Sequence, residues 1–277
     1  MQVNAYAKIN LSLDILGRRE DGYHELAMVM QSISLRDVLT VEPAGETSLS
    51  CTDPRVPCGP ENTLWRAASL FFQETGLPGG VRVALEKHIP SQAGLGGGSA
   101  DAAALLRALN QMFQAGLAEE ALLRLGLQVG ADVPFCLRGG AALAQGVGER
   151  LSPAPPLPPC FLTVCKPPAG VSTAEAFRRA DQRREKGKNH TAAVLEALRC
   201  GSLESLGRAL GNDFENVMQV PQVEAIKSAM KARGAAGASM TGSGSAVFGL
   251  FASREAACSC AAALKGEYPE TFFCTPV

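Results

Sequence analysis

A glycine-rich stretch decides how the rest of this sequence is interpreted: Pro90-Ser91-Gln92-Ala93-Gly94-Leu95-Gly96-Gly97-Gly98-Ser99-Ala100-Asp101. It follows a β-branched run at 81–85 that predicts a strand, and it precedes apolar residues at helical spacing between 105 and 113. Glycines lack the Cβ that would keep an anion away from the backbone, and a helix N-terminus offers unpaired N–H groups. We expect Ser99 to be the N-cap of that helix, with its hydroxyl within reach of a phosphate oxygen or a metal. The sequence therefore predicts a phosphate-binding loop.

Two common phosphate motifs do not fit this loop. No Lys-Ser or Lys-Thr pair closes it, which excludes a Walker A sequence. The segment from Gly94 to Ser99 approaches the pattern G-x-G-x-x-G but ends in serine. It also lacks an early βαβ unit followed by an acidic residue at the spacing of a dinucleotide site. The loop is therefore neither of these motifs, and a flexible loop of the same composition stays the alternative to phosphate binding.

The composition excludes several classes of protein. The chain has 277 residues, enough for two domains, and 46 % of them are apolar, so it can bury a sizeable core. A net charge of −1 gives no basic face of the kind that binds nucleic acid. No apolar run approaches the roughly 18–20 residues that cross a bilayer, and the first residues do not form a signal peptide. We expect a cytoplasmic protein that binds neither nucleic acid nor membrane.

The nine cysteines predict reduced thiols rather than disulfides or a metal centre. They contain no C-x-x-C pair, and the chain has only three histidines, so a zinc site has little support. Several of the cysteines stand in apolar runs and are expected to pack as small hydrophobic side chains.

The pattern of hydrophobic residues indicates an α+β protein, because strands dominate the beginning and helices most of the remainder. A capping-box sequence at 172–175 predicts the start of one helix. The basic run at 183–188 is expected to be a solvated loop. Further strands are predicted at 10–16, 32–35, 38–41, 161–165 and 246–251, and further helices at 62–74, 119–127, 191–199, 203–210 and 222–232.

The sharpest break in composition is a proline-rich segment at 151–159, with five prolines in seven residues. Such a segment continues neither a helix nor a central strand. We interpret it as the crossover between an N-terminal domain of residues 1–152 and a C-terminal domain of residues 153–277, with an ordinary surface loop as the alternative.

Three further segments are candidates for chemistry. Asp132 stands between small residues in Gly130-Ala131-Asp132-Val133-Pro134, where it either caps its neighbours or orients and deprotonates an attacking hydroxyl; spacing alone favours neither. Lys8 is flanked by apolar residues: it is either a solvated lysine, as most are, or a point charge placed over developing phosphate charge. The glycine and hydroxyl segment at 237–245 either closes over the first loop or makes a tight turn, and alone it favours the turn.

The segments around Lys8, the glycine loop, Asp132 and residues 237–245 occur together, in this order along the chain, in the GHMP family of small-molecule kinases. The chain resembles this family along nearly its whole length. The stretch at 17–26, Gly-Arg-Arg-Glu-Asp-Gly-Tyr-His-Glu-Leu, is similar to the branch of the family that phosphorylates a cytidine diphosphate-linked alcohol for isoprenoid precursor synthesis. It does not resemble the mevalonate- or homoserine-type members. The resemblance implies a two-domain fold, in which the N-terminal domain is like domain 2 of ribosomal protein S5 and the C-terminal domain is ferredoxin-like.

The resemblance also implies roles for individual residues. Lys8 and Asp132 match the catalytic pair, Asp132 next to the accepting hydroxyl and Lys8 lowering the pKa of that hydroxyl or steadying the transferred phosphoryl group. On the substrate side, Asn10 and His24 match contact positions, Tyr23 and Phe177 match the aromatic residues that enclose the cytosine, and Thr241, Gly242 and Ser243 match the third family motif. On the nucleotide side, Asn62 and Lys87 match positions near the adenosine, and Pro90, Gly94, Leu95, Gly96, Gly97, Gly98, Ser99 and Ala100 match the triphosphate loop.

The chain departs from the family at one point of the loop. Many relatives carry Ser-Ser where this sequence has Gly97-Gly98, and its serine comes one place later. The resemblance implies ATP and Mg²⁺ as cofactors, but because of this departure we name no protein ligand for the metal. A monomer or weak homodimer is expected. The alternatives are a GHMP kinase for another small alcohol and a non-catalytic nucleotide-binding module of the same fold.

Overall fold

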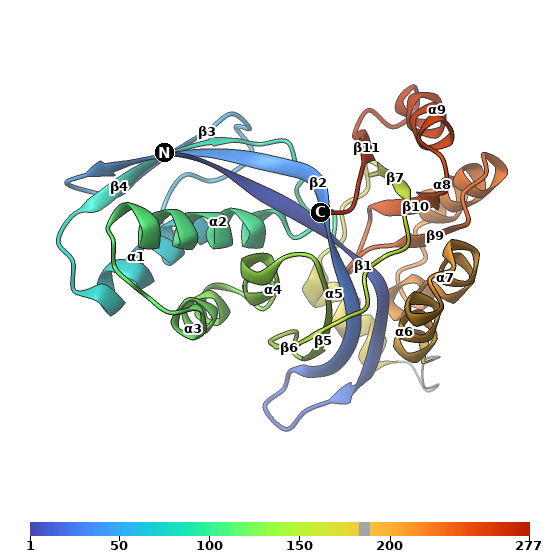
Figure 1. Cartoon of the computed structure of the whole chain (residues 1–277), viewed down its shortest axis with the longest axis horizontal. Helices are drawn as coiled ribbons and strands as arrows, with labels where there is room; N and C mark the ends of the chain where they lie inside the picture. The colour runs from blue at the N-terminus through green and yellow to red at the C-terminus, as the bar shows by residue number, and fades with distance from the viewer. Residues whose placement is uncertain (183–188) are drawn as a thin grey trace. The chain divides into compact units, whose positions relative to one another are not determined.

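The computed structural model describes residues 1–182 and 189–277, which form two compact units (Figure 1). Unit 1 contains residues 1–7, 35–89 and 96–139, and unit 2 contains residues 8–34, 90–95 and 140–277. The basic run at 183–188, predicted to be a solvated loop, lies outside the described residues. The division into domains at residue 152 stays a prediction.

Two long strands supply residues to both units. Strand β1 covers Gln2–Arg18 and β2 covers His24–Ala44. The sequence predicted two short strands at 32–35 and 38–41, but β2 runs through both without a break. The intervening polar pair Arg36-Asp37 does not end the strand, because Asp37 is completely buried while Arg36 points to solvent.

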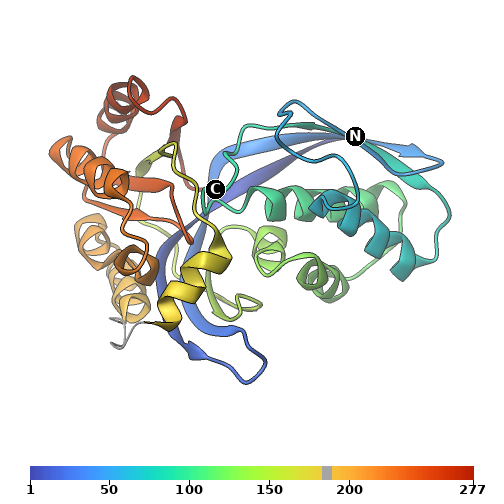
Figure 2. The same cartoon turned by 180° about the vertical axis from the view of Figure 1, so that it is seen from behind.

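In unit 1 a small sheet is covered by helices. Strand β4 (Gly80–Glu86) pairs antiparallel with residues 38–44 of β2 and parallel with β3 (Ser48–Cys51). Helix α1 (Thr63–Thr75) packs on α2 (Gly97–Met112), while α3 (Glu119–Val129) and α4 (Val133–Arg138) pack on α2 in turn, as Figures 1 and 2 show. Helix α2 is rich in buried alanines, which let its neighbours approach closely and so make it the central helix of the unit.

The ferredoxin-like part of the prediction is confirmed in unit 2. Strands β7 (Phe161–Cys165), β9 (Gly237–Met240), β10 (Val247–Phe251) and β11 (Thr271–Cys274) form an antiparallel sheet in the order β11-β7-β10-β9. Helix α8 (Pro221–Ala232) packs on β9 and β10, and α9 (Arg254–Lys265) packs on β7 and β11. The chain order is therefore βαββαβ, with further helices inserted after β7.

The remaining elements of unit 2 complete its sheets and the inserted helices. Strand β5 (Ala141–Gly146) pairs with residues 26–31 of β2, β6 (Arg150–Pro153) pairs with β5, and β8 (Gly211–Asn212) pairs with β1. The inserted helices are α5 (Thr173–Asp181), α6 (His190–Cys200), α7 (Leu203–Ala209) and the short 3₁₀ helix η1 (Asp213–Asn216). Helix α5 begins where the capping box predicted, although the side chain of Ser172 makes no capping hydrogen bond.

The structure bears on two expectations from the composition, which concern the cysteines and membrane-spanning helices. All nine cysteines are free thiols, as predicted. Within residues 1–182 and 189–277, no helix combines the length and apolarity that a membrane span requires.

Candidate active site

In unit 2, Asn10 joins two segments that are distant in sequence, strand β1 and the turn that follows β9. The ammonium group of Lys8 donates to Asn10 Oδ1 at 2.8 Å, and the backbone N–H of Gly242 donates to the same oxygen at 3.0 Å. The backbone N–H of Asn10 donates to Thr241 Oγ1 at 3.0 Å. Lys8, Asn10 and Thr241 are all at least 96 % buried, so these bonds lie away from water, where they hold their geometry well.

The first half of the glycine loop contacts the same segments of unit 2. The Thr241 hydroxyl donates to the carbonyl of Gly94 at 3.2 Å, and the Lys8 N–H donates to the carbonyl of Leu95 at 3.0 Å. A Cβ atom at Gly94 would lie 2.0 Å from the Thr241 carbonyl oxygen, and Gly94 has a φ of +75°. Only glycine fits there, which explains why the two glycine segments recognised in the sequence pack together. The motif at 237–245 thus makes a turn between β9 and β10 and also contacts the first loop.

The second half of the glycine loop begins helix α2 in unit 1, and here the expected N-cap is wrong. The N-cap is Gly96, which has a φ of +70°, and Ser99 is the third helical residue. The helix begins earlier than predicted because glycine can take this φ, so no side chain is needed at the cap. The N-cap supplies no side-chain hydrogen bond to the first turn of α2. These first N–H groups are the ones that a helix offers to an anion.

Asp132 lies next to this turn in unit 1. It is the N-cap residue of α4, but its side chain makes no capping hydrogen bond to that helix. A Cβ atom at Gly130 would lie 3.8 Å from the Ser99 hydroxyl, so the segment carrying Asp132 packs beside the start of α2. Of the two interpretations left open by the sequence, the capping role therefore has no support in the contacts of α4.

The predicted nucleotide residues Asn62 and Lys87 occupy structured positions in unit 1. Asn62 is the N-cap of α1: its Oδ1 accepts from the Leu64 N–H at 2.9 Å, and its Nδ2 donates to the Pro57 carbonyl at 2.7 Å. Lys87 is paired with the carboxylates of Asp37 and Asp101. Burial opposes the charge of Lys87, but Asp101 and Asp37 outweigh it and raise the pKa of the ammonium. The remaining loop residues, Pro90, Gly97, Gly98 and Ala100, continue the chain through the turn described above.

On the substrate side, unit 2 brings together one predicted contact position, His24, and one predicted aromatic position, Phe177. The rings of His24 and Phe177 stack with centroids 4.5 Å apart at 16°, and Phe177 packs edge-on against Phe214 at 5.0 Å. The His24 Nε2 lies 2.6 Å from Asp181 Oδ1. Tyr23 is 65 % exposed and contributes no ring contact in the described residues. Ser243 shares a 2.9 Å hydrogen bond with Thr173, at the start of α5.

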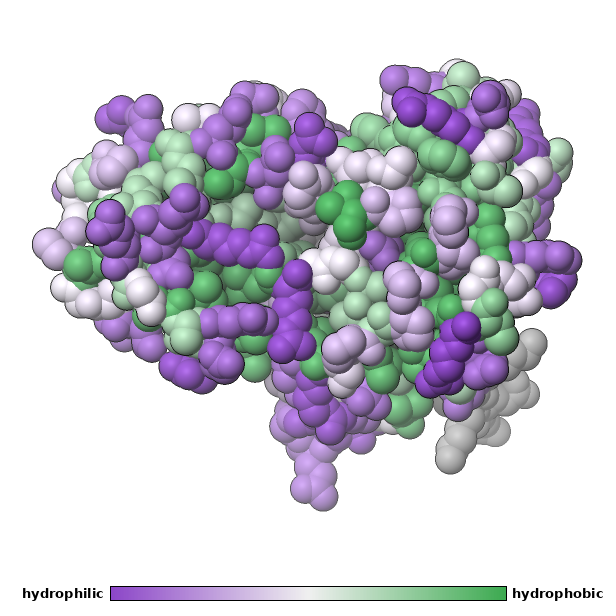
Figure 3. Space-filling model, in the orientation of Figure 1, coloured by the Kyte–Doolittle hydropathy of each residue, from purple (hydrophilic) through white to green (hydrophobic). Residues whose placement is uncertain are grey.

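The tip between β1 and β2, which carries Tyr23 and His24, is strongly polar, as Figure 3 shows. Arg19 forms ion pairs with Asp21 at 2.8 Å and with Glu25 at 3.3 Å. Glu25 is also paired with Arg150 at the start of β6. These contacts fix the backbone of the tip while its aromatic side chain remains accessible.

Comparisons with known proteins agree with this arrangement. Residues 62–140 match the family model described as GHMP kinases N terminal domain, and residues 194–270 match GHMP kinases C terminal. The chain is 48 % identical to the 4-diphosphocytidyl-2-C-methyl-D-erythritol kinase of Pelotomaculum thermopropionicum over 257 aligned residues. This alignment covers 91 % of this chain and 90 % of that protein. The chain belongs to the GHMP kinase family.

Another relative and a solved structure similar to this GHMP kinase carry the same enzyme name. It is 47 % identical to the 4-diphosphocytidyl-2-C-methyl-D-erythritol kinase of Moorella thermoacetica, with 96 % of this chain and 95 % of that protein covered. A crystal structure of 4-(cytidine 5'-diphospho)-2C-methyl-D-erythritol kinase superposes with a TM-score of 0.85 at 41 % identity, covering 100 % of this chain and 99 % of the other. A homoserine kinase from Cytophaga hutchinsonii shares the fold, with a TM-score of 0.77 at 20 % identity over 99 % of this chain and 95 % of the other. This GHMP kinase is an ATP-dependent phosphotransferase for a small molecule.

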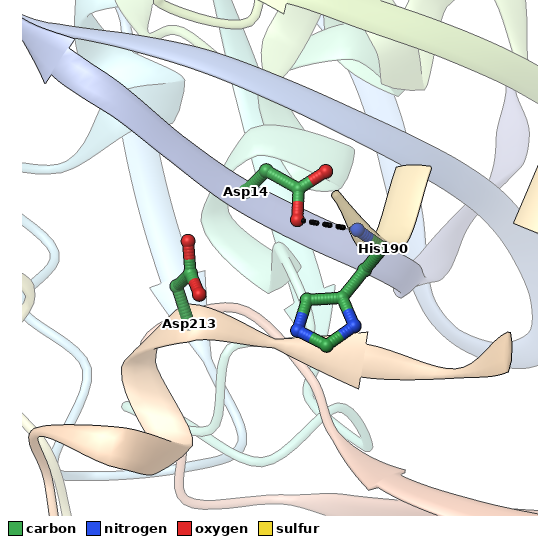
Figure 4. Close-up of side chains that lie close together, drawn as sticks. All are labelled: Asp14, His190 and Asp213. Atoms are coloured by element: carbon green, nitrogen blue, oxygen red, sulfur yellow. Dashed lines mark hydrogen bonds between the residues drawn. The ribbon is translucent and has the colours of Figure 1, made fainter. Parts of the chain in front are cut away.

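One cluster of possible metal ligands lies outside the segments above (Figure 4). Among the residues described, Asp14, His190 and Asp213 have ligand atoms within 4.8 Å of one another. Both oxygens of Asp14 accept backbone N–H groups at the start of α6, from His190 at 2.9 Å and Thr191 at 2.8 Å. Asp213 Oδ2 accepts the N–H of Ile15 at 2.9 Å. These bonds join β1 to α6 and η1, so the cluster stabilises this fold, and we assign no metal to it.

Sequence reasoning missed four residues of this GHMP kinase that contact the predicted ones. Asp37 and Asp101 hold Lys87, while Asp181 and Phe214 support His24 and Phe177. No local sequence pattern distinguishes Asp181 and Phe214, the two residues on the substrate side. Asp101 did carry a signal, because a carboxylate among buried alanines in the second turn of a helix requires a partner.

Proposed function

We propose that this GHMP kinase transfers the γ-phosphoryl group of ATP to the 2-hydroxyl of 4-diphosphocytidyl-2-C-methyl-D-erythritol, in the non-mevalonate pathway to isoprenoid precursors. The observation that carries the proposal is the identity of 40–48 % to relatives named for this activity, over nearly the whole chain. The aromatic and imidazole cluster beside the polar tip of β1 and β2 gives independent support, because such a site suits a pyrimidine base.

Lys8 is proposed to stabilise the phosphoryl group during transfer. Phosphoryl transfer depends mainly on positioning and on compensation of charge at the transferred oxygens. Asn10 holds the ammonium of Lys8 at 2.8 Å and is itself fixed by Thr241 and Gly242. The lysine therefore needs little reorganisation when the reaction begins, which supports a catalytic rather than a solvated role.

Asp132 is proposed to receive the proton of the attacking hydroxyl, directly or through an ordered water. The hydroxyl oxygen forms the new bond to the γ-phosphorus, the bond from that phosphorus to the bridging oxygen breaks, and ADP leaves. A half-buried carboxylate that does not cap its own helix and lies beside the start of α2 is suitably placed for this task.

The triphosphate is proposed to bind at the N-terminus of α2 and along the glycine loop. The N–H groups of the first turn and the positive end of the helix dipole favour phosphate there. Mg²⁺, when bound with ATP, would neutralise charge on the phosphate oxygens. The Ser99 hydroxyl, in the first turn of α2, offers an oxygen ligand of the kind that Mg²⁺ prefers, so the residues present fit this ion.

The cytidine end of the substrate is proposed to bind between Tyr23 and the His24–Phe177 stack. Because the imidazole already covers one face of Phe177, the base is expected to meet His24 on that side unless His24 moves. The localisation of the protein in the cytoplasm, and its state as a monomer or weak homodimer, remain predictions.

The test is an assay coupled to ADP release, with purified protein, Mg²⁺ and a panel of alcohols. We expect turnover with 4-diphosphocytidyl-2-C-methyl-D-erythritol and none above background with mevalonate or homoserine. Turnover with one of the other alcohols instead would reject the substrate, and absence of turnover with every alcohol would favour a non-catalytic module.

A further inference from the structure

A buried cluster of charged side chains lies beneath the phosphate-binding turn of unit 1. Its members are Asp37 on β2, Lys87 after β4 and Asp101 on α2, and we call it the Asp37–Lys87–Asp101 cluster. The side chains of these residues are 0 %, 7 % and 4 % exposed, respectively. Three ionisable groups so well hidden from water are rare unless each is paired or neutral.

Asp37 is the fixed anion of this cluster. Its Oδ1 accepts the backbone N–H groups of His88 at 2.5 Å and of Ile89 at 2.7 Å, and its Oδ2 accepts the ammonium of Lys87. Three donors on one carboxylate stabilise its charged form strongly. Lys87 therefore already has the one counter-charge that it needs.

Asp101 is held quite differently. Its Oδ2 lies 3.3 Å from the ammonium of Lys87, while its Oδ1 is buried without a hydrogen-bond partner. Burying an ionised carboxylate with one unsatisfied oxygen costs a large free energy of desolvation, whereas burying a neutral carboxyl in the same place costs much less. Burial, reinforced by the neighbouring Asp37 and opposed by Lys87, raises the pKa of Asp101 well above its usual value. With Asp101 neutral, the ammonium of Lys87 and the carboxylate of Asp37 leave the cluster without net charge.

The position of the cluster connects it to the nucleotide loop. Asp101 is the fifth residue of α2, counted from Gly97. A Cβ atom at Gly97 would lie 2.8 Å from the ammonium nitrogen of Lys87, so this nitrogen lies against the first helical residue. A positive charge at a helix N-terminus strengthens its attraction for phosphate, and a negative charge one turn inside weakens it.

We propose that Asp101 is a positioning residue for ATP: in its neutral form it holds the ammonium of Lys87 against the first turn of α2 without adding negative charge beneath the phosphates. The inference rests on ATP as the ligand of the loop, which belongs to the proposed function, but it does not depend on which alcohol is phosphorylated. It assigns a role to a buried carboxyl that itself touches no substrate.

Two substitutions separate neutrality from simple packing. Asp101→Asn is neutral, has nearly the same shape and retains an oxygen that can accept from Lys87. Asp101→Leu is also neutral and of similar size, but it removes the acceptor. Binding of a non-hydrolysable ATP analogue to each purified full-length variant, measured at equilibrium, reports on the nucleotide site without any alcohol substrate. Thermal unfolding of each variant, and of the control Glu74→Gln on the exposed face of α1, checks that the protein is folded.

We expect Asp101→Asn to bind the analogue within about twofold of wild type and Asp101→Leu to bind it about 10-fold more weakly, as for loss of one hydrogen bond to a charged group. Weakening of about 10-fold in Asp101→Asn would overturn the proposal, because the negative charge would then be required. Wild-type affinity in a folded Asp101→Leu would overturn it as well, because Lys87 would then be held without Asp101.

Infrared spectroscopy keeps the proposal testable even where Asp101→Leu does not fold. At neutral pH, wild type is expected to show the carbonyl stretching band of a protonated carboxylic acid, and Asp101→Asn is expected to lack it. Absence of this band from wild type would contradict the proposal. If the nucleotide binds as expected but 4-diphosphocytidyl-2-C-methyl-D-erythritol is not phosphorylated, the proposed substrate fails while this inference stands.

Discussion

Asn10 illustrates how much of this protein depends on single side chains. One amide oxygen accepts both the ammonium of Lys8 and the backbone N–H of Gly242, which lies more than two hundred positions further along the chain. A buried amide used in this way fixes the direction of a flexible lysine, because the rotamers of that lysine are restricted before any ligand binds. At the scale of the residue, catalysis is therefore expected to depend on groups that are already in place.

Asp132→Asn tests the proposed proton acceptor. The substitution keeps the shape of the side chain but lowers its basicity, so kcat is expected to fall by roughly 100-fold or more. Affinity for the ATP analogue should change little. Steady-state kinetics with the cytidine substrate measures both effects. The matched control is Asp53→Asn, which changes another half-buried carboxylate, paired with Arg55 at 2.9 Å. A kcat near that of wild type would show that Asp132 is not the proton acceptor and has only a structural role at the start of α4.

Tyr23→Ala tests the aromatic wall of the cytidine site. Stacking of one base on an aromatic ring contributes about 1–3 kcal/mol, so KM for the cytidine substrate is expected to rise by roughly 5- to 150-fold. KM for ATP should stay the same. Tyr23 is 65 % exposed, so the fold should tolerate its loss; Leu16→Ala, at an exposed position on β1, controls for removal of a large side chain. Equal changes in both KM values would contradict the assignment.

Asp101→Asn also has an expected effect on stability. An unfolded aspartate has a pKa of about 3.9, and the pKa of folded Asp101 is raised. The folded protein therefore holds a proton that the unfolded chain loses, and the unfolding free energy of wild type falls as pH rises between these two values. The asparagine of the variant binds no such proton, so the unfolding free energy of the variant does not fall in this way. The unfolding free energy of the variant minus that of wild type should therefore increase with pH between the two pKa values, by at most ~1.4 kcal/mol per pH unit. Urea unfolding at several pH values measures the difference; a constant difference would contradict the raised pKa.

At the scale of the element, the glycine loop works through close backbone contact. Gly94 approaches the Thr241 carbonyl, Gly97 approaches Lys87, and Gly96 provides the cap of α2. At each of these three positions a different steric constraint requires glycine, so the glycine run is not simply a flexible linker. The predicted N-cap at Ser99 failed for this reason: the sequence pattern identified a polar cap, whereas the backbone uses a left-handed glycine.

Gly94→Ala is expected to damage this loop. A left-handed φ costs about 1–2 kcal/mol for a residue with a Cβ, and at Gly94 the Cβ would also clash with the Thr241 carbonyl, at 2.0 Å. Gly201→Ala is the matched control, since Gly201 has a φ of +64° but has nothing within 4 Å of an added Cβ. The Gly94 variant should unfold at a lower temperature than the control and bind the ATP analogue about 10-fold more weakly. Equal behaviour of the two variants would show that the contact with Thr241 is unimportant.

At the scale of the whole molecule, the sequence predicted the class of fold and most regular elements. Amphipathic patterns located α1, α3, α6 and α8 within a few residues, because one face of each packs on a core. Strand β2 was predicted in two pieces, since a local pattern cannot anticipate that Asp37 is buried against a lysine more than 40 positions later. The short strands β3, β5 and β6 carry too few residues for a periodic signal.

The candidate site was partly predictable for a similar reason. Lys8, the glycine loop and the segment at 237–245 stand out by composition, and unit 2 brings Lys8, Gly94 and Thr241 together. Asp181 and Phe214 were not predicted, because an aspartate at a helix end and a phenylalanine in an apolar context are ordinary in sequence. Their contribution arises from three-dimensional packing, to which a single sequence gives no direct access.

The chemical structure of the product shows whether this chain phosphorylates one hydroxyl of a cytidine-linked alcohol. Phosphorus and proton NMR of a completed reaction would show where the new phosphoryl group is attached. We expect one new phosphomonoester on the 2-hydroxyl of the methylerythritol moiety for each ADP formed. A phosphoryl group on another hydroxyl, or ADP formed without any new phosphomonoester, would contradict the account.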